Sequence, residues 1–373
     1  MSNTGETLAP TAADAETTFS ASGGLVGRLA RLGCAIGFTS YQSGLLYMVG
    51  RNARGLHIHQ SSMPRPMGLR YDATDRRLLL SAAGQILRFE DVLRSGERAN
   101  EIFDACFAPR IIHITGRLEG HDVGIGVDDM PIFVNTRFNC LATVDPRDSF
   151  RALWHPPFID TIVDEDRCHL NGLAMRDGLP AYATAVSRSN TIDGWRDRRA
   201  DGGVVIDVAT GRIVCQGLSM PHSPRWHQGT LYVLNAGTGE FGRVRLPEAE
   251  HEMGQFVPIT FCPGFLRGLS FSGGFAFVGL SKPRYSRFEG LALDDRLRAT
   301  DSEAWCGVQI IDLASGACVD WLRLDGPVGE IFDVEVFPGI ACPMAVSPNA
   351  PELANLITHK DRIAAPPTPP PQT

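Results

Sequence analysis

One unit of sequence occurs twice in this chain, and that repetition is the strongest constraint on its fold. The stretches "AYATAVSRSN" and "GGVVIDVATGRIV" correspond in order and character to "FAFVGLSKPRYSR" and "CGVQIIDLASGACV". Each copy has a strand pattern that runs into a small residue and a serine, then a polar insertion, then a strand pattern that closes in an Asp-x-Ala-x-Gly turn. Self-similarity of this kind indicates a repeat architecture, in which each unit packs against its neighbours.

The segments ahead of these strands also repeat. "HLNGLAM" precedes the first copy and "FLRGLSF" the second, and looser copies are "RPMGLRY", "HDVGIGV", "MPHSPRW" and "EIFDVEV". Consecutive copies are about 45 to 65 residues apart, a spacing typical of four-stranded propeller blades. No strand patterns follow the last copy to complete a sheet, whereas "FTSYQSGLLYMVG" and "GLHIHQSSM" come before the first. The sequence therefore predicts an all-β fold, a six-bladed β-propeller closed by strands from both termini. A pair of β-sandwiches is the alternative, but it does not explain a unit that recurs six times.

Three segments are predicted along the 373 residues. Residues 1–24 are small, polar and acidic, and we expect them to be disordered. Residues 25–345 form the propeller. Residues 346–373 end in "AAPPTPPPQT" and are expected to be a Pro-rich flexible tail. Helical periodicity is scarce, and its best candidate is the short stretch "SGERANEIFDACF".

Composition limits the classes of binding partner and the cellular compartment that we expect for this protein. The net charge of -7 argues against a nucleic-acid surface, because phosphate binding needs clustered cations that acids do not balance. No apolar run approaches the roughly 20 residues that span a bilayer, so we expect neither a nucleic-acid nor a membrane partner. The nine cysteines occur singly, without a C-x-x-C pair, and the N-terminus lacks the basic start and apolar centre of a secretory signal. These features predict reduced thiols in a cytoplasmic protein.

Polar residues stand at the start of all six repeated segments. The first strand of each propeller blade lines the central channel, so these residues are expected to meet at one end of it, which we call the entrance face. The residues that define the predicted entrance face are Arg65, His121, Asp122, His169, Asn171, His222, Arg267, Glu330 and Asp333.

A metal site is one interpretation of this set. Neutral imidazoles of His121, His169 and His222 can occupy three positions around a divalent metal ion and leave one open. A carboxylate of Asp122, Glu330 or Asp333 would be a further ligand or a general base, and Glu330 is the predicted ligand. The opposing interpretation is that each histidine only satisfies main-chain groups at the start of a strand.

Metal-free acid/base chemistry is the other catalytic interpretation, and the sequence leaves the two open. Here a histidine carries the proton, Asp122 is a candidate general base, and Arg267 is part of the catalytic set. Arg65 or Arg267 would hold an anionic substrate, which Asn171 and Asp333 would also contact.

Two long insertions, at residues 188–202 and 282–306, follow the second strand of their blades and are expected to emerge at the same face. Loops of this length in a compact fold are often lids or binding elements. If they cover the entrance face, Trp195, Arg196 and Arg284 become substrate contacts.

The motifs "DRCHLNGLA", "SMPHSPRW" and "CPGFLRGL" resemble those of a bacterial family of conserved proteins of unknown function, and the likeness runs from about Phe38 to Pro338. This resemblance implies a propeller-like domain and no particular activity. The segment "NGLAM" is also similar to the Asn-Gly-Ile/Leu-Ala signature of lactonase and strictosidine-synthase-like six-bladed propellers, which implies that Asn171 binds a divalent ion in the channel. Those families place an aspartate after the second strand, where this chain has "LLLSAAG" and "LYVLNAG", so calcium-dependent lactone hydrolysis does not carry over.

Two classes of function fit these observations. The first is an enzyme that acts on a small molecule or a peptide side chain at a His/Asn/Asp/Arg pocket, either with a divalent metal ion or without a cofactor. The second is a non-catalytic scaffold that uses the same face to bind a peptide or protein.

Overall fold

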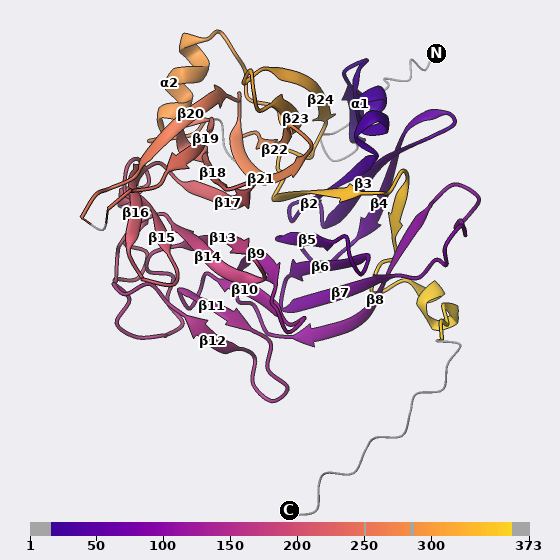
Figure 1. Ribbon diagram of the computed structural model, residues 1–373, viewed down its shortest axis with the longest axis horizontal. Helices are drawn as coiled ribbons and strands as arrows, with labels where there is room; N and C mark the ends of the chain where they lie inside the picture. Colours follow the sequence, from indigo (N-terminus) through magenta and orange to yellow (C-terminus); the bar gives the residue numbers. More distant parts are fainter. Residues whose placement is uncertain (1–15, 250, 284–286, 360–373) are drawn as a thin grey trace, which may run out of the picture.

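Six β-sheets surround one axis in the computed structural model, which describes residues 16–249, 251–283 and 287–359 (Figure 1). Each sheet is one blade, and its first strand lies nearest the centre. The predicted six-bladed β-propeller is therefore confirmed.

The four strands of each blade are antiparallel, and the blades are numbered around the ring from the one that joins the two ends of the chain. Blade 1 comprises β25 (Asp333–Pro338), β2 (Cys34–Ser40), β3 (Leu45–Asn52) and β4 (Gly55–Ser62). Blades 2 and 3 comprise β5 (Leu69–Asp72), β6 (Arg77–Ala82), β7 (Gln85–Asp91) and β8 (Ala105–Ile114), then β9 (Gly120–Ile125), β10 (Pro131–Asn135), β11 (Cys140–Thr143) and β12 (Arg151–Trp154). Blades 4 and 5 comprise β13 (Leu170–Arg176), β14 (Leu179–Ala185), β15 (Gly203–Asp207) and β16 (Ile213–Leu218), then β17 (Pro221–His227), β18 (Thr230–Asn235), β19 (Glu240–Arg245) and β20 (Gln255–Phe261). Blade 6 comprises β21 (Phe265–Ser272), β22 (Phe275–Ser281), β23 (Cys306–Asp312) and β24 (Cys318–Asp325).

Strands from both ends of the chain close the ring, as predicted. In blade 1, β25 supplies the innermost strand and pairs with β2 in a register that sets Thr39 opposite Asp333. The main-chain N–H of Phe332 donates to the Thr39 carbonyl at 2.7 Å and extends this pairing to the strand start.

Two more terminal strands support the neighbouring blades. β1 (Thr18–Ala21) adds to the outer edge of β24, and β26 (Pro343–Ala345) pairs in parallel with the start of β8. The segment expected to be disordered thus contains a strand at residues 18–21, and the expected tail contains a 3₁₀ turn, Pro351–Asn355. The rest of those two expectations, residues 1–15 and 360–373, lies outside the described residues.

The repeated Asp-x-Ala-x-Gly segments form equivalent turns between the third and fourth strands of blades 4 and 6. The carboxylate of Asp207 accepts the main-chain N–H of Thr210 at 2.9 Å, and that of Asp312 accepts the N–H of Ser315 at 2.8 Å. These local hydrogen bonds explain why aspartate and a glycine with positive φ recur at this place in the unit.

The core is divided among six hydrophobic clusters, one between each pair of adjacent blades. The interface between blades 1 and 2 shows the packing: Tyr71 of β5 meets Phe337 of β25 edge-on, with 5.1 Å between ring centroids. Each blade therefore buries both of its faces against its neighbours, as repeat folds require.

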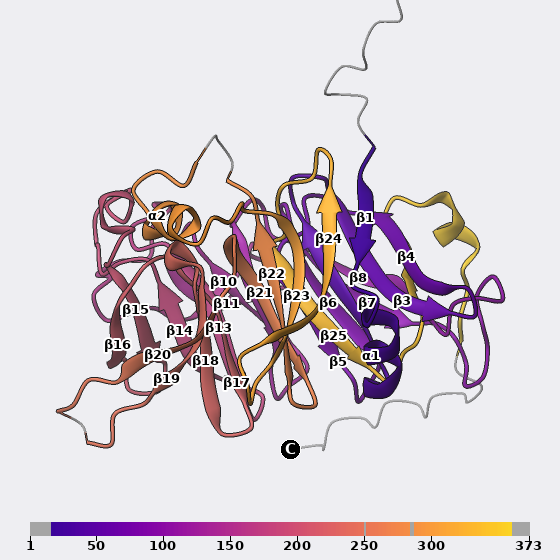
Figure 2. The same cartoon turned by 90° about the horizontal axis from the view of Figure 1, so that it is seen from above.

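Two helices flank the ring near opposite faces (Figure 2). α1 (Leu25–Leu32) buries Leu25 and Leu29 between blades 1 and 6, and α2 (Ala292–Ala299) lies in the second long insertion. Among the described helices, none is both long and apolar enough to cross a membrane.

The stretch "SGERANEIFDACF" does not form the expected helix. It is a series of turns that leads into β8. Three of its residues, Gly96, Asn100 and Glu101, have φ values of 83°, 49° and 61°, which no α-helix accommodates. Its apolar residues pack on the blade and so mimic the spacing of an amphipathic helix.

Candidate functional site

The structure brings five of the predicted entrance-face residues into one connected group. The rings of His121 and His169 meet edge-on with 4.9 Å between centroids, and Asn171 Nδ2 lies 3.4 Å from His222 Nε2. The guanidinium of Arg267 completes the group from blade 6, and its charge reaches His222. Residues about 50 positions apart in sequence therefore meet because each begins an inner strand.

Two of the histidines are oriented by the same local hydrogen bond. His121 Nδ1 donates to the carbonyl of Glu119 at 2.9 Å, and His222 Nδ1 donates to the carbonyl of Met220 at 2.8 Å. Each acceptor lies two residues earlier, so the turn that starts the inner strand fixes the ring. A neutral imidazole that donates through Nδ1 has its basic lone pair on Nε2.

His169 has a carboxylate partner instead of a carbonyl. Its Nδ1 lies 2.7 Å from Asp166 Oδ2, and its main-chain N–H donates to Asp166 Oδ1 at 3.0 Å. The φ of His169 is 52°, a left-handed conformation that costs a non-glycine residue on the order of 1 kcal/mol and is frequent at functional sites. An aspartate that holds a histidine in one tautomer is a recurring arrangement in acid/base catalysis.

Asp166 was missed by the sequence reasoning. The signal is the short spacing Asp-x-x-His in "DRCH", which lies outside any helix pattern and ahead of the strand. The backbone turn at His169 closes that spacing so that both oxygens of Asp166 face one residue.

His222 is buried, and the cation Arg267 and two other histidines lie near it. Burial lowers its pKa well below the usual value, the charge of Arg267 and the nearby His121 and His169 lower it further, and the bond to the Met220 carbonyl opposes them. His222 is therefore a neutral base or hydrogen-bonding group at physiological pH.

We expect His222 to stay neutral, as the Nδ1–H tautomer, when exposed histidines have become protonated. Because its pKa is lower in the folded state than in the unfolded state, the unfolded state binds more protons, and the free energy of unfolding falls as pH falls below about 6.5. Urea titrations at pH 7 and pH 5 should therefore show a larger loss for wild type than for His222→Gln, while long-range ¹H–¹⁵N spectra report the tautomer. The exposed His251→Gln variant is the control. Equal losses in all three proteins would contradict this assignment.

Aromatic rings surround the guanidinium of Arg267. Its Cζ lies 4.7 Å from the ring centroid of Phe332 and 5.7 Å from that of Phe265, and the residue is 8% exposed. Phe332 also lies 5.3 Å from the ring of His121, so one phenyl ring connects the arginine to the histidines. A cation held in an apolar setting binds anions more strongly than one in water.

Glu330 lies apart from the histidine rings in the described contacts. Its Oε2 accepts the hydroxyl of Ser40 at 3.1 Å and the main-chain N–H of Gln42 at 3.2 Å, which ties the carboxylate to the β2–β3 turn. Among the described residues, no group of three or more His, Cys, Asp or Glu side chains is placed to hold a metal ion. The assignment of Glu330 and the three histidines to a metal stays a prediction.

Asp122 and Asp333 belong to a buried ion network centred on Arg225. Arg225 binds Asp122 through both terminal nitrogens, at 2.7 and 3.2 Å, and lies 3.4 Å from Asp333. Main-chain N–H groups also donate to both carboxylates, from Leu173 at 3.0 Å and from Leu69 at 2.9 Å. These two carboxylates link the inner strands of several blades, and their predicted catalytic and substrate contacts stay predictions.

Asp122, Asp333 and Glu335 are the three carboxylates near Arg225, and two of them have raised pKa values. Burial raises the pKa of Asp333 to about 7; the charge of Arg225 opposes the rise and that of Asp122 adds to it. Burial likewise raises the pKa of Glu335, against which Arg70 acts from 3.5 Å. Arg225 was not among the predicted residues, because it lies inside "MPHSPRW" rather than at the start of this segment.

The first long insertion covers one face of His169. Trp195 is 7% exposed and stacks on His169, with 4.2 Å between ring centroids and 27° between planes. Arg196 lies over the indole from the solvent side and pairs with Asp193. The second insertion contributes Phe288 and α2 to the same hydrophobic cluster as Trp195. Arg284, the other predicted contact, lies outside the described residues.

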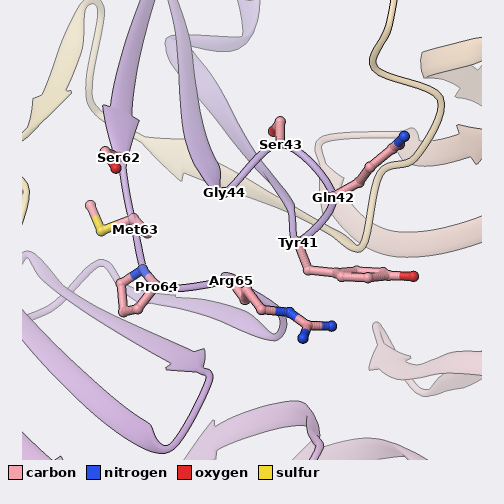
Figure 3. A pocket seen from close by; sticks show the side chains of 8 residues that line it. All are labelled: Tyr41, Gln42, Ser43, Gly44, Ser62, Met63, Pro64 and Arg65. Carbon is pink, nitrogen blue, oxygen red and sulfur yellow. The ribbon is translucent and has the colours of Figure 1, made fainter.

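Arg65 is connected to this group of residues through Tyr41 and Phe332. Its guanidinium lies 5.4 Å from the ring centroid of Tyr41, and Tyr41 meets Phe332 edge-on at 5.7 Å. Beside this pair is a cavity of about 600 Å³ between the β2–β3 turn and the segment that follows β4 (Figure 3). The residues that line it are Tyr41, Gln42, Ser43, Gly44, Ser62, Met63, Pro64 and Arg65.

Comparison with solved structures supports the fold. A chain of the nidogen/laminin complex aligns with a TM-score of 0.51 and 11% identity over 82% of this chain and 99% of its own. Virginiamycin B lyase from Staphylococcus aureus aligns at 0.40 and 11% over 83% and 99%, and the PQQ-bound aldose sugar dehydrogenase from Streptomyces coelicolor at 0.44 and 14% over 78% and 91%. At such identities the likeness concerns the fold alone. No curated protein matches the chain.

The model of one protein family, described as a domain of unknown function, matches residues 24–346. This range includes all six blades and every described residue of the candidate site. The resemblance to a family of unknown function is thereby confirmed, and the chain belongs to the DUF4915 family.

Proposed function

We propose that this protein is an enzyme that moves a proton on a small anionic molecule or a peptide side chain bound at the entrance face. The observation that carries the proposal is the 2.7 Å contact between Asp166 and His169 Nδ1, in a group that also contains a buried arginine. This arrangement supplies a base, an electrostatic partner for the protonated base, and an anchor for negative charge.

His169 Nε2 accepts the proton in this proposal. Asp166 keeps the imidazole in the Nδ1–H tautomer and stabilises the imidazolium that forms when Nε2 is protonated. Trp195 covers one face of the ring and limits access by water. His121 and the neutral His222 lie close enough to donate or accept a hydrogen bond as the substrate rearranges.

Arg267 binds the anionic group and stabilises negative charge that develops when the proton leaves. The rings of Phe265 and Phe332 exclude water around it, which strengthens that interaction. The polar groups of Asn171 and Trp195 would orient the bound substrate. Asn171, held by the hydroxyl of Thr184 at 2.8 Å, contacts His222, and the Nε1–H of Trp195 has no acceptor among the described residues.

A divalent ion is the cofactor in the alternative form of this proposal. The donor chemistry fits in part, because metal-bound histidines commonly donate the other ring nitrogen to a carbonyl or carboxylate, as these do. His121, His169 and His222 would hold the ion, with Glu330 as the fourth ligand, and it would supply Lewis-acid polarisation of the substrate. Since the described donors are not grouped around one point, we assign the proton transfer to the Asp166–His169 pair.

The proposed partner is a small molecule or a peptide, and we propose neither nucleic acid nor membrane. The net charge of -7 favours this assignment. All nine cysteines are free, and eight are buried, which accords with a proposed cytoplasmic location.

An untargeted metabolite screen tests the function. Purified full-length protein is incubated with a cell extract and, in parallel, with a peptide library, and mass spectrometry compares wild type with His169→Asn. We expect compounds that change only with the wild-type protein, and we expect turnover to survive exhaustive chelation with metal content measured in the same samples. If wild type and variant give identical profiles while wild type retains a peptide from the library, the non-catalytic scaffold is the correct function. Turnover lost on chelation and restored by one metal would instead establish the metal-dependent form.

A further inference from the structure

Arg65 is a second cation of the predicted entrance face. It lies in the segment that connects β4 to β5. It is exposed, and no ion pair joins it to a carboxylate among the described residues. Its φ is 49°, so the backbone holds a non-glycine residue in a left-handed conformation. Its guanidinium makes a cation–π contact with Tyr41, with 5.4 Å between Cζ and the ring centroid, which favours one position of the side chain.

The adjoining cavity is open to solvent and has both polar and apolar lining residues. Its lining includes the side chains of Gln42, Ser43 and Ser62 together with Arg65, and none of its described lining residues is acidic. At about 600 Å³ it lies within the range of small-molecule sites. Figure 3 shows the side chain of Arg65 beside that of Tyr41 at one side of this hollow. The carboxylate of Glu330 is buried and accepts hydrogen bonds from the Ser40 hydroxyl and the Gln42 N–H.

Two aromatic rings, those of Tyr41 and Phe332, connect Arg65 to Arg267. The ring centroids of Tyr41 and Phe332 are 5.7 Å apart, and Arg267 Cζ lies 4.7 Å from the centroid of Phe332. Each of the two guanidinium groups therefore lies against one member of the same aromatic pair. Guanidinium groups bind carboxylate and phosphate in bidentate fashion, so two of them linked through one aromatic pair suit a ligand with two anionic ends.

We propose that the substrate of the entrance face is a dianion, with one carboxylate or phosphate on Arg267 and the other on Arg65 at the mouth of the cavity. This inference rests on the proposed function, and it adds the substrate class and a specificity-determining residue. Arg267 binds the anionic group of the substrate that lies beside His169. Arg65 binds the second anionic group, so the distance between the two arginines selects the length of the substrate.

Calorimetric binding of defined acids to the full-length protein tests this inference. The probes are butyrate as a monoanion, straight dicarboxylates of four to eight carbons, and 3-phosphonopropionate as a carboxylate with a phosphonate. We expect one chain length to bind at least about tenfold more tightly than butyrate, as a second charge-assisted pair provides. A preference for the phosphonate or for the dicarboxylates identifies the second anionic group.

The variants separate the two cations. Arg65→Gln should reduce the affinity of the best dianion to about that of butyrate and leave butyrate binding unchanged, whereas Arg267→Gln should weaken both. Arg65→Lys should lie between wild type and Arg65→Gln. The control is Arg54→Gln, an exposed arginine in the β3–β4 turn at the opposite end of the same blade.

Two results would overturn the inference in distinguishable ways. If dianions bind no better than butyrate, or if Arg65→Gln leaves their affinity unchanged while Arg267→Gln abolishes it, Arg65 is not part of the site and the proposed function stands. If no acid binds, or if Arg267→Gln leaves all affinities unchanged, the proposed function fails as well. Circular dichroism confirms that each variant is folded.

Discussion

The Arg225→Gln variant is expected to lose about 3–5 kcal/mol of unfolding free energy. Arg225 is buried and forms ion pairs with Asp122 and Asp333, and the carboxylate of Glu335 is also close enough to raise its pKa. Its guanidinium further donates to the main-chain carbonyls of Leu173 and Leu269, from two neighbouring blades. Removal of the charge leaves buried carboxylates without a counter-ion and breaks contacts that join inner strands around the ring.

Urea unfolding followed by circular dichroism measures this effect. The matched control is Arg176→Gln, an exposed arginine that lies over the Trp226 ring at 5.1 Å and should cost less than about 1 kcal/mol. Because the damage comes from uncompensated charge, addition of Asp122→Asn to Arg225→Gln should recover part of the loss. A stability within 1 kcal/mol of wild type, or a double variant that is weaker than the sum of its parts, would show that the network does not stabilise the ring.

The Asp166→Asn variant is expected to reduce turnover by about 10²–10⁴-fold, close to the loss in His169→Asn. Asparagine has nearly the same shape as aspartate but carries no charge to stabilise the imidazolium of His169. The base acts in the transition state, so kcat should fall while KM changes little. The substrate identified by the metabolite screen is used for steady-state kinetics of both variants.

Asp164→Asn is the matched control, because it removes a carboxylate from the same loop. Asp164 pairs with Arg137 at the surface and does not contact His169. Its turnover should stay within about twofold of wild type. If Asp166→Asn behaves like this control while His169→Asn is inactive, Asp166 does not assist the base. If the double variant Asp166→Asn/His169→Asn is slower than either single variant by the product of their effects, the two residues act independently.

The architecture could be predicted because its signals are local and repeated. A polar residue lies near the start of each inner strand, small and apolar residues follow it, and a pattern that occurs six times is recognisable even where single copies are poor. The position of "EIFDVEV" after all other strand patterns was enough to predict that β25 completes blade 1 with β2. By contrast, β1 pairs with an edge about 300 residues away, and its four residues carry no sign of that partner.

The candidate site was predictable in its location and less so in its roles. His121, His169, Asn171, His222 and Arg267 meet because repeat position alone sets which end of the channel they occupy. Side-chain partners depend on distances that sequence does not encode.

Asp122 illustrates this limit, because it stands next to His121 in sequence but is held by Arg225, which is 103 positions away. Asp166 was missed for the opposite reason. It lies before the repeated segment, and only the left-handed turn at His169 brings its carboxylate to the imidazole.

The late position of β25 in the chain has a consequence for biosynthesis. A ribosome delivers β2, β3 and β4 early, but the strand that completes their sheet emerges only with residues 333–338. Blades 2 to 6 can form in the order of translation, whereas the first sheet must keep an open inner edge until almost the whole ring has been made. Ring closure therefore has to await the synthesis of residues 333–338, and until then the unpaired edge of β2 is a potential site of pairing with other chains.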